Sequence, residues 1–502
     1  MDVDLIDETE VNPQSQKSAG KRPAILPIDD AHPFDLEAYI SSYTGRTAVD
    51  RLIYLIAQCP TLAPQAFALA ITQMQQLRDT TLYQRAVDAY AVAQKQKEDL
   101  PPHTEVAAVD ATWVEKTNAK NVADRTKLEV ELKTYSSNMI KESIRMGYRD
   151  LALFYRSIGE YNIALKNYTK SREYCTTSQH ILDMTTSIVE LLMEQRNYPH
   201  IPTYVFKAEA ALEAITGSRV AAANNQQNTA SNPNAKPAAK EKAMSERDRT
   251  QTKLDVALAM SYFSQGQYEK AAQAFLKVGA MSNLEQWAGL YIAPSDIAIY
   301  GTLCALATYP RPAIQAQLLD NDNFGVYIEQ EPYIRELIDA YMGSRFKTVL
   351  EVLERYSTRH YLDIVLAPHV THLVNSIREL ALILYFQPFA SINLERMAGA
   401  FGWTMEYLEE QVVTLIKKGS IQARVDRQNK ILRARVTDQR AALFQRAIKS
   451  GADMQSTNRK LLLRMKLQQA DLVVKASRSG AHPGMPAAYH QSGHEAVMSV
   501  MG

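Results

Sequence analysis

The sequence contains few cysteines, no long apolar run and almost no net charge. Its three cysteines, Cys59, Cys175 and Cys304, each lie more than a hundred positions from the next. This spacing provides neither a paired metal-binding motif nor a disulfide framework, and it indicates small buried residues in a reducing compartment. The longest apolar run, Leu380 to Phe386, is far below the ~18 residues that a membrane-spanning helix requires. The start is acidic where a signal peptide would be basic and then apolar, so we expect neither a membrane span nor secretion.

Residue patterns typical of enzyme sites are also absent. The sequence has no glycine-rich phosphate-binding loop, no His-Glu-x-x-His zinc motif and no His-x-His pair of the kind that a metal-dependent isopeptidase uses. His369 and His372 lie on an expected helix, but without a neighbouring acid or cysteine they indicate surface or partner contacts more than a metal site. His490 and His494 fall in a polar tail that cannot preorganise ligands. We therefore expect no enzymatic activity, no cofactor and no metal site.

The charged residues are unevenly distributed, although the net charge of the chain is only +1. Sixteen lysines and arginines but only four acidic residues lie between Lys417 and Arg478, so the remainder of the chain is net acidic. Two parts of opposite charge meet different partners or each other. The overall composition, 46% hydrophobic and 22% charged over 502 residues, is typical of a folded protein of roughly three domains.

A helical pattern of apolar residues begins at Asp35 and continues to about Leu212. Repeats with tetratricopeptide-like spacing follow within the middle of the chain. The small residue at the turn lets a second helix fold back, the alanine permits close helix approach, and the aromatic residues fill the space between helix pairs. Ordinary helix hairpins in a globular bundle are the alternative, and either interpretation makes residues 35–386 all-α. The repeat positions are Gly159, Tyr161, Ala164 and Tyr168; Gly266, Tyr268, Ala271 and Phe275; and, at the last three positions only, Tyr198, Ile201 and Val205.

Residues 388–437 follow the pattern of a winged helix. Ser391 is expected to cap a short helix and Thr404 a second one, each ended by a glycine. Apolar and polar residues then alternate over 421–436 on both sides of a polar turn, which predicts a hairpin. Two helices followed by a hairpin form a winged helix.

A winged helix in basic surroundings raises the hypothesis of nucleic-acid binding. Base readout uses the exposed face of the second helix. With the apolar residues of that helix facing the core, its exposed face carries Glu406 and Glu410, with Glu409 beside them, and these carboxylates would repel phosphate. We assign the positive charge of Arg433, Arg435 and the last helices to an acidic partner instead. The pattern therefore favours protein binding over DNA reading.

An unpaired strand edge and an apolar last helix predict the partner-binding residues. A small sheet with a free edge can be extended by the sheet of a neighbouring subunit, because exposed strand N–H and C=O groups seek partners. The apolar residues of the last expected helix exceed what one face can bury, which predicts packing into a multi-helix assembly. The residues predicted to bind partners are Gln422, Arg424, Arg433, Arg435, Leu463, Leu467 and Val474.

Composition and periodicity divide the chain into segments. The aperiodic, proline-containing start and the Ser/Gly/Pro/His-rich end are expected to be disordered, and a stretch rich in alanine, asparagine and glutamine is expected to form a disordered loop. The expected segments are a leader (1–33), N-terminal helical repeats (34–216), a low-complexity loop (217–247), further helical repeats (248–387), the winged helix (388–437), C-terminal helices (438–476) and a tail (477–502).

Several of these segments resemble the PCI-domain proteins, a family shared by the proteasome lid, the COP-9 signalosome and a translation initiation factor. The similarity runs from residue 35 to about residue 450. The stretches RMAGAFGW and LIKKGSIQARVD would suit any PCI protein, whereas IAIYGTLCALAT and KILRARVTDQR resemble the signalosome members in particular. The resemblance implies a mostly α fold in which tetratricopeptide-like repeats lead into a PCI domain, formed by 248–387 and the winged helix, and then into a terminal helix.

The resemblance also implies a function. It predicts a non-catalytic scaffold subunit of an eight-subunit complex that removes the ubiquitin-like modifier from cullins, with the metalloisopeptidase in a separate subunit. It further implies contacts with other PCI subunits through winged-helix edges, a helical bundle with further subunits, indirect contact with cullin-RING ligases, no membrane association, and location in the cytoplasm and nucleus. The alternatives are a regulatory subunit of the proteasome lid and a winged-helix adaptor that binds nucleic acid.

Overall fold

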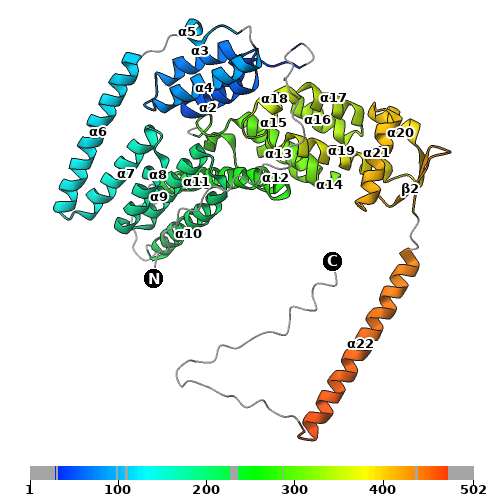
Figure 1. Cartoon of the computed structure of the whole chain (residues 1–502). Coiled ribbons are helices and arrows are strands. Elements are labelled where there is room, and N and C mark those ends of the chain that lie inside the picture. Colours follow the sequence, from blue (N-terminus) through cyan, green and yellow to red (C-terminus); the bar gives the residue numbers. More distant parts are fainter. Residues whose placement is uncertain are drawn as a thin grey trace. The chain divides into compact units, whose positions relative to one another are not determined.

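The computed structural model describes residues 29, 32–97, 100–107, 111–225, 236–284, 287–435 and 439–472. Val474, the tail, and the leader apart from Asp29, His32 and Pro33 lie outside these residues. The chain forms two units that divide after Ala434, and each is described by itself (Figure 1). Within the described residues the chain is mainly helical, as the sequence predicted, and no helix there is long and apolar enough to cross a membrane.

The first helices form a bundle with its own hydrophobic core. Asp35 begins the first helix, because its carboxylate accepts hydrogen bonds from the N–H groups of Glu37 (3.0 Å) and Ala38 (3.2 Å). Phe67 and Tyr90 are buried in this core with ring centroids 5.0 Å apart. The helices are α1 (Leu36–Ser41), α2 (Gly45–Gln58), α3 (Ala63–Met74), α4 (Thr81–Gln96) and α5 (His103–Val106).

The repeat positions lie at turns and between paired helices, as their spacing predicts. Gly159 and Gly266 have φ angles of +86° and +73°, in the left-handed region that glycine adopts without strain. Ala164 and Ala271 are fully buried, and their small side chains allow neighbouring helices to approach closely. Helices α7 and α8, α9 and α10, and α11 and α12 pack as pairs. Their bounds, with the preceding helix, are α6 (Ala111–Ser137), α7 (Lys141–Ser157), α8 (Tyr161–Ser171), α9 (Ser178–Gln195), α10 (Ile201–Asn225), α11 (Lys236–Ser264) and α12 (Tyr268–Leu276).

Helix extends further into the low-complexity segment than the sequence predicted. The predicted loop covers 217–247, but α10 continues to Asn225 and α11 begins at Lys236, and only 226–235 lie outside the described residues. Alanine, lysine, glutamate and glutamine form helices readily, and adding a turn to an existing helix avoids a new nucleation step. The absence of large apolar side chains therefore did not mean an absence of helix.

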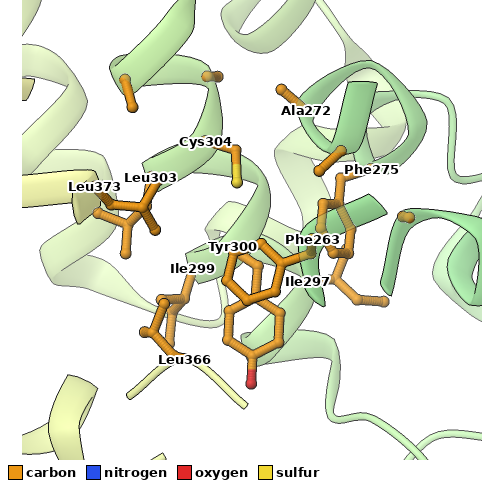
Figure 2. Packing of buried hydrophobic residues seen from close by; sticks show 14 of the residues in the cluster. Phe263, Ala272, Phe275, Ile297, Ile299, Tyr300, Leu303, Cys304, Leu366 and Leu373 are labelled. Atoms are coloured by element: carbon orange, nitrogen blue, oxygen red, sulfur yellow. The ribbon is translucent and has the colours of Figure 1, made fainter. Parts of the chain in front are cut away.

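Helix α13 (Pro294–Thr308) runs through the larger core of the first unit. Pro294 occupies its first turn, where the missing N–H costs no hydrogen bond. All twelve residues from 296 to 307 are buried, so the helix packs on every side. Figure 2 shows Tyr300 stacked on Phe263 of α11, with ring centroids 5.1 Å apart, and Leu303 beside Leu373. This all-round burial explains why the segment is almost entirely apolar.

The helices after α13 lead to the winged helix. The side-chain oxygen of Asn321 caps the helix that begins at Asp322, because it accepts a hydrogen bond from the N–H of Phe324 (3.3 Å). The side-chain NH2 of Asn321 donates to the C=O of Leu276 (2.9 Å). The Phe346 ring stacks on Phe401 of the winged helix at 5.4 Å. The elements are α14 (Arg311–Ile314), the π-helical turn η6 (Gln315–Leu319), α15 (Asp322–Ile328), α16 (Pro332–Met342), α17 (Phe346–Arg355), α18 (Ser357–Leu362) and α19 (Val370–Phe386).

A buried polar network joins the N-terminal bundle to the larger core. The Arg51 side chain of α2 is 2% exposed and pairs with Asp296 of α13 (2.9 Å) and with Asp363 (2.7 Å). The hydroxyl of Tyr43 donates to Asp296 at 2.7 Å, and that of Tyr300 donates to Asp363 at 2.8 Å. Such paired and hydrogen-bonded charges can be buried, whereas unpaired ones could not.

The winged helix contains a strand that the sequence did not predict. The cap of its first helix is Asn393 instead of Ser391, because the Asn393 side chain accepts from the N–H of Glu395 at 2.7 Å, and residues 391–393 form a strand. Gly402 (φ +69°) and Gly419 (φ +77°) end the two helices as predicted. The elements are β1 (Ser391–Asn393), α20 (Leu394–Phe401), α21 (Met405–Lys417), β2 (Ala423–Asp426) and β3 (Ile431–Ala434).

The second unit contains α22 (Gln439–Gln469), a single continuous helix. The sequence predicted more than one helix over 438–476. Gly451 lies within α22 and does not interrupt it, because an isolated glycine costs only about 1 kcal/mol relative to alanine and the nearby Lys449 and Ala452 are strong helix formers. Large apolar side chains of α22 are exposed, including Leu463 and Leu467.

Candidate partner-binding surface

The winged-helix sheet has three strands in the order β1-β3-β2. β3 is therefore the central strand, and β2 is an edge strand whose outer side pairs with no described strand. Side chains alternate across the sheet: Leu432 and Ala423 are buried against the helices, whereas Arg424 and Arg433 are exposed. This gives a free edge and a solvent-facing surface on the same small element.

Hydrogen bonds to β1 identify the backbone groups that β3 uses on each side. The N–H of Ala434 donates to the C=O of Ala390, and the N–H of Leu394 donates to the C=O of Lys430, both at 2.8 Å. In an antiparallel ladder, successive residues of a central strand bond alternately to the two neighbours. The even-numbered residues of β3 therefore bond to β1, and the odd-numbered residues bond to β2.

This alternation determines which groups of β2 face the free edge. Arg424 and Asp426 lie opposite odd-numbered residues of β3, so their N–H and C=O groups are used within the sheet. The N–H and C=O groups of Ala423 and Val425 point the other way, toward the side without a described strand. We call these four groups of Ala423 and Val425 the β2 edge. Arg424 therefore contributes a side chain to the exposed surface and no hydrogen-bond donor to the edge.

Two arginines lie directly opposite each other on the exposed face. Arg424 of β2 pairs with Arg433 of β3 in the register. Like charges at directly opposite positions destabilise a sheet. Neither guanidinium forms an ion pair with a residue of the described chain.

The acidic groups of the winged helix near these arginines are already engaged. Glu409 pairs with Arg427, and Glu395 pairs with Lys430 at 2.7 Å. Asp426 accepts hydrogen bonds from the side chain (3.0 Å) and the backbone N–H (3.3 Å) of Asn429 in the turn, and these bonds lower the pKa of its carboxyl. Arg433 also helps to lower the pKa of Asp426, so it is the positive charge of Arg424 that is available to a partner.

Helix α21 presents the carboxylates that the sequence placed there. Leu408, Val412 and Leu415 are buried, and Glu406 and Glu410 are exposed. Carboxylates on the helix that would enter the major groove repel phosphate and match few base edges. The exposed face of α21 is therefore unsuited to DNA reading.

The structure brings together only part of the predicted partner-binding set. Arg424 lies on the exposed side of the edge strand, and exposed Gln422 immediately precedes that strand. Arg433 belongs to the central strand, and its role is confined to the exposed face. Arg435 is exposed and begins the second unit, where Leu463 and Leu467 are 60% and 38% exposed on α22. Val474 lies outside the described residues. Sequence reasoning missed β1, which is too short for alternation to show.

Of the histidines singled out in the sequence, His369 and His372 pack against aromatic rings, and His490 and His494 lie outside the described residues. The ring of His369 lies 4.7 Å from Phe263, and its Nδ1 is 3.0 Å from the hydroxyl of Tyr268. Burial and, to a smaller extent, the neighbouring His372 lower the pKa of His369 to about 4. Within the described residues, no group of three or more histidine, cysteine or acidic side chains could hold a metal ion.

Comparisons with known proteins cover most of the chain. The model of the 26S proteasome subunit RPN7 family matches residues 110–317, and that of the PCI domain matches residues 347–435. The COP9 signalosome complex subunit 1 of Arabidopsis thaliana is 34% identical over 455 residues, which cover 90% of this chain and 94% of the relative. Subunit 1b of the same complex from Drosophila melanogaster is 32% identical, covering 96% and 93%. The 26S proteasome non-ATPase regulatory subunit 6 of Oryza sativa subsp. japonica is 23% identical and covers 37% and 46%.

Proposed function

The chain belongs to the family of COP9 signalosome complex subunit 1, and we propose that it is a scaffold subunit of that complex. In this role it supports the removal of the ubiquitin-like modifier from cullin-RING ligases by a separate metalloisopeptidase subunit. The observation that carries the proposal is the similarity to signalosome subunit 1 over nine-tenths of the chain, compared with about a third for the proteasome lid subunit. The architecture supports it, since helical repeats lead into a PCI domain with a winged helix.

A scaffold needs surfaces that bind other subunits, and two surfaces of the chain are suited to this role. The β2 edge leaves the backbone groups of Ala423 and Val425 available for pairing with another strand. Helix α22 has exposed apolar side chains along its length, which favour a helical bundle with further subunits. We propose that other PCI subunits pair with the β2 edge and that cullin-RING ligases are contacted through those subunits.

The chain fits a non-catalytic member of the complex. Its relatives are PCI proteins of the scaffold type, and the residues that carry its fold are engaged in packing and structural ion pairs. We propose that the isolated chain has no isopeptidase activity. Incubating the purified chain with a cullin that carries the ubiquitin-like modifier should leave the conjugate intact with or without a chelator. Chelator-sensitive cleavage by the chain alone would contradict this proposal.

Affinity purification of the tagged full chain from its own cells, followed by mass spectrometry, tests the assignment directly. Recovery of other signalosome subunits in stoichiometric amounts is expected. Recovery of proteasome lid subunits instead would assign the chain to the proteasome lid as a regulatory subunit. Recovery of nucleic acid that nuclease treatment removes would support the role of a nucleic-acid-binding adaptor.

We further propose that the protein resides in the cytoplasm and the nucleus, as its resemblance to the signalosome members implies. Fluorescence microscopy of the tagged full chain should show both compartments. Confinement to an organelle other than the nucleus, or to a membrane, would contradict the proposal.

A further inference from the structure

We infer that the strand that pairs with the β2 edge carries an aspartate or glutamate directly opposite Arg424. This inference rests on the proposed function, because it specifies the chemistry of the partner at the same edge. It commits to an antiparallel strand of another subunit as the occupant. The β2 edge supplies the backbone pairing, and Arg424 selects among the strands that could use it.

The need for a carboxylate follows from the neighbours of Arg424 within the sheet. On its inner side Arg424 faces Arg433, so one cross-strand position beside it already holds a like charge. Neither arginine forms an ion pair with a described acid of the winged helix: Glu409 and Glu395 hold other cations, and Asp426 is hydrogen-bonded to Asn429 and interacts electrostatically with Arg433, not Arg424. The cross-strand position on the outer side is the one left for a counter-charge.

The backbone pattern places that position close to Arg424. An added antiparallel strand would exchange hydrogen bonds with Ala423 and Val425, which leaves Arg424 at a non-hydrogen-bonded position. At such positions, opposite Cα atoms are about 4.5 Å apart and the side chains lie closer than at hydrogen-bonded positions. A carboxylate there can reach the guanidinium, and the same face exposes Gln422 two residues earlier.

The surroundings favour a protein strand over nucleic acid. The groups that remain to be satisfied at β2 are backbone N–H and C=O groups, which a strand pairs and a phosphate backbone does not. The exposed face of α21 carries Glu406 and Glu410, which repel phosphate. A carboxylate opposite Arg424 supplies a counter-charge to its guanidinium, and the backbone of the partner strand pairs with the N–H and C=O groups of the β2 edge.

The test compares charge variants of the full chain in the assembled complex. Tagged wild type, Arg424→Gln, Arg424→Glu and Val425→Pro are expressed in cells with the other signalosome subunits, and the retained subunits are quantified after washing at 100 and 400 mM NaCl. Arg335→Glu is the matched control, since Arg335 is exposed on α16 and the charge change is the same. A photo-crosslinking residue at Gln422 identifies the partner strand by mass spectrometry.

We expect Arg424→Glu to lower retention of the crosslinked subunit by about tenfold and Arg424→Gln by a few-fold, because a cross-strand charge pair is replaced by a repulsive or a neutral one. Arg335→Glu should have no effect. The crosslinked peptide should contain an Asp or Glu, and changing that residue to Lys should restore the binding of Arg424→Glu.

The outcomes separate this inference from the proposed function. If Val425→Pro no longer retains the crosslinked subunit while Arg424→Glu does, the edge pairs as proposed, but the inference of an acidic residue opposite Arg424 is wrong. If both variants retain it, the edge contact itself is wrong. If the wild-type chain binds a 20-base-pair duplex at 150 mM NaCl and Arg424→Glu does not, the arginines serve nucleic acid and the inference is overturned. If Val425→Pro does not fold, the test still rests on Arg424→Glu and on its rescue by changing the acidic residue of the partner strand to Lys.

Discussion

Arg51 and Asp363, separated by 312 positions in the sequence, form a buried ion pair in which Nη1 lies 2.7 Å from Oδ2. The same guanidinium reaches Asp296 through Nη2 at 2.9 Å, and its Cζ lies 4.1 Å from the ring centre of Tyr43. Burial alone would raise the pKa of Asp363, but Arg51 and several hydrogen bonds reverse this effect and lower it. Burial raises the pKa of Asp296, and the charge of Arg51 offsets this rise only in part. One cation therefore serves two carboxylates where the N-terminal bundle meets α13.

Replacing Arg51 by methionine should destabilise the first unit by about 3–5 kcal/mol, because two buried carboxylates would lose their only shared cation. The stability loss caused by the substitution should decrease as the pH falls, since protonation of the two carboxylates removes their uncompensated negative charge. Urea denaturation at pH 7 and pH 5 measures both effects. Arg85→Met is the control: Arg85 is half exposed and pairs with Asp50 at 3.2 Å, so its loss should cost below about 1 kcal/mol. Equal losses for the two variants would show that the buried pair contributes nothing special.

Because His360 is buried, the folded chain should lose stability as the pH falls. Its Nε2 lies 3.1 Å from the hydroxyl of Tyr333, and burial, with a smaller effect of Arg359, lowers its pKa to about 4. The unfolded chain therefore takes up a proton near pH 6.5 that the folded chain does not. Stability from this group is present above pH 6.5 and is lost as the pH falls toward 4, by up to about 1.4 kcal/mol per pH unit.

The free energy of unfolding of His360→Gln, measured by urea denaturation between pH 7 and pH 4.5, should fall less steeply with acidification than that of the wild type. Replacement of the exposed His200 by glutamine is the control for the loss of one imidazole. A wild-type slope in His360→Gln would mean that other groups account for the acid sensitivity.

Two glycines at the same repeat position should differ in their tolerance of alanine. Both have positive φ, so either substitution costs about 1–2 kcal/mol of backbone strain. A Cβ at Gly159 would also clash with Oδ2 of buried Asp79 and lie 3.0 Å from Nη1 of Arg46, whereas at Gly266 the nearest atom is the Tyr268 hydroxyl at 3.9 Å. Gly159→Ala should therefore lower the stability by at least about 1 kcal/mol more than Gly266→Ala. Thermal unfolding of both variants is the measurement, and a reversed order would refute the packing argument.

The apolar surface of α22 should matter for assembly and not for folding. Leu463 and Leu467 lie four residues apart on one side of the helix and are exposed. The double variant Leu463→Ser/Leu467→Ser should keep the helical circular dichroism of the wild type, while the subunits that co-purify with the tagged chain decrease. Gln455→Ser is a control at an exposed polar position of the same helix. Undiminished co-purification would mean that these leucines are not part of the bundle.

Local chemistry was sufficient to predict many elements from the sequence. Gly159 and Gly266 mark turns because glycine alone adopts positive φ without strain, and Gly402 and Gly419 end helices for the same reason. The alternation of Ala423, Arg424 and Val425 predicted a strand with one buried face, and the apolar stripe of α21 predicted which of its glutamates would be exposed. Each of these signals is complete within a few residues of the chain.

Tertiary structure decided what depends on distant residues. The three residues of β1 are a strand only because β3, forty positions later, supplies their hydrogen bonds, and the same ladder decides that Ala423 and Val425, not Arg424, face the edge. Arg51 gave no signal of its role, since its two acidic partners lie more than 240 positions away. Short-range preferences set helix ends and strand faces, whereas the choice of a partner for a backbone group or a buried charge is made only when the folded chain brings the two together.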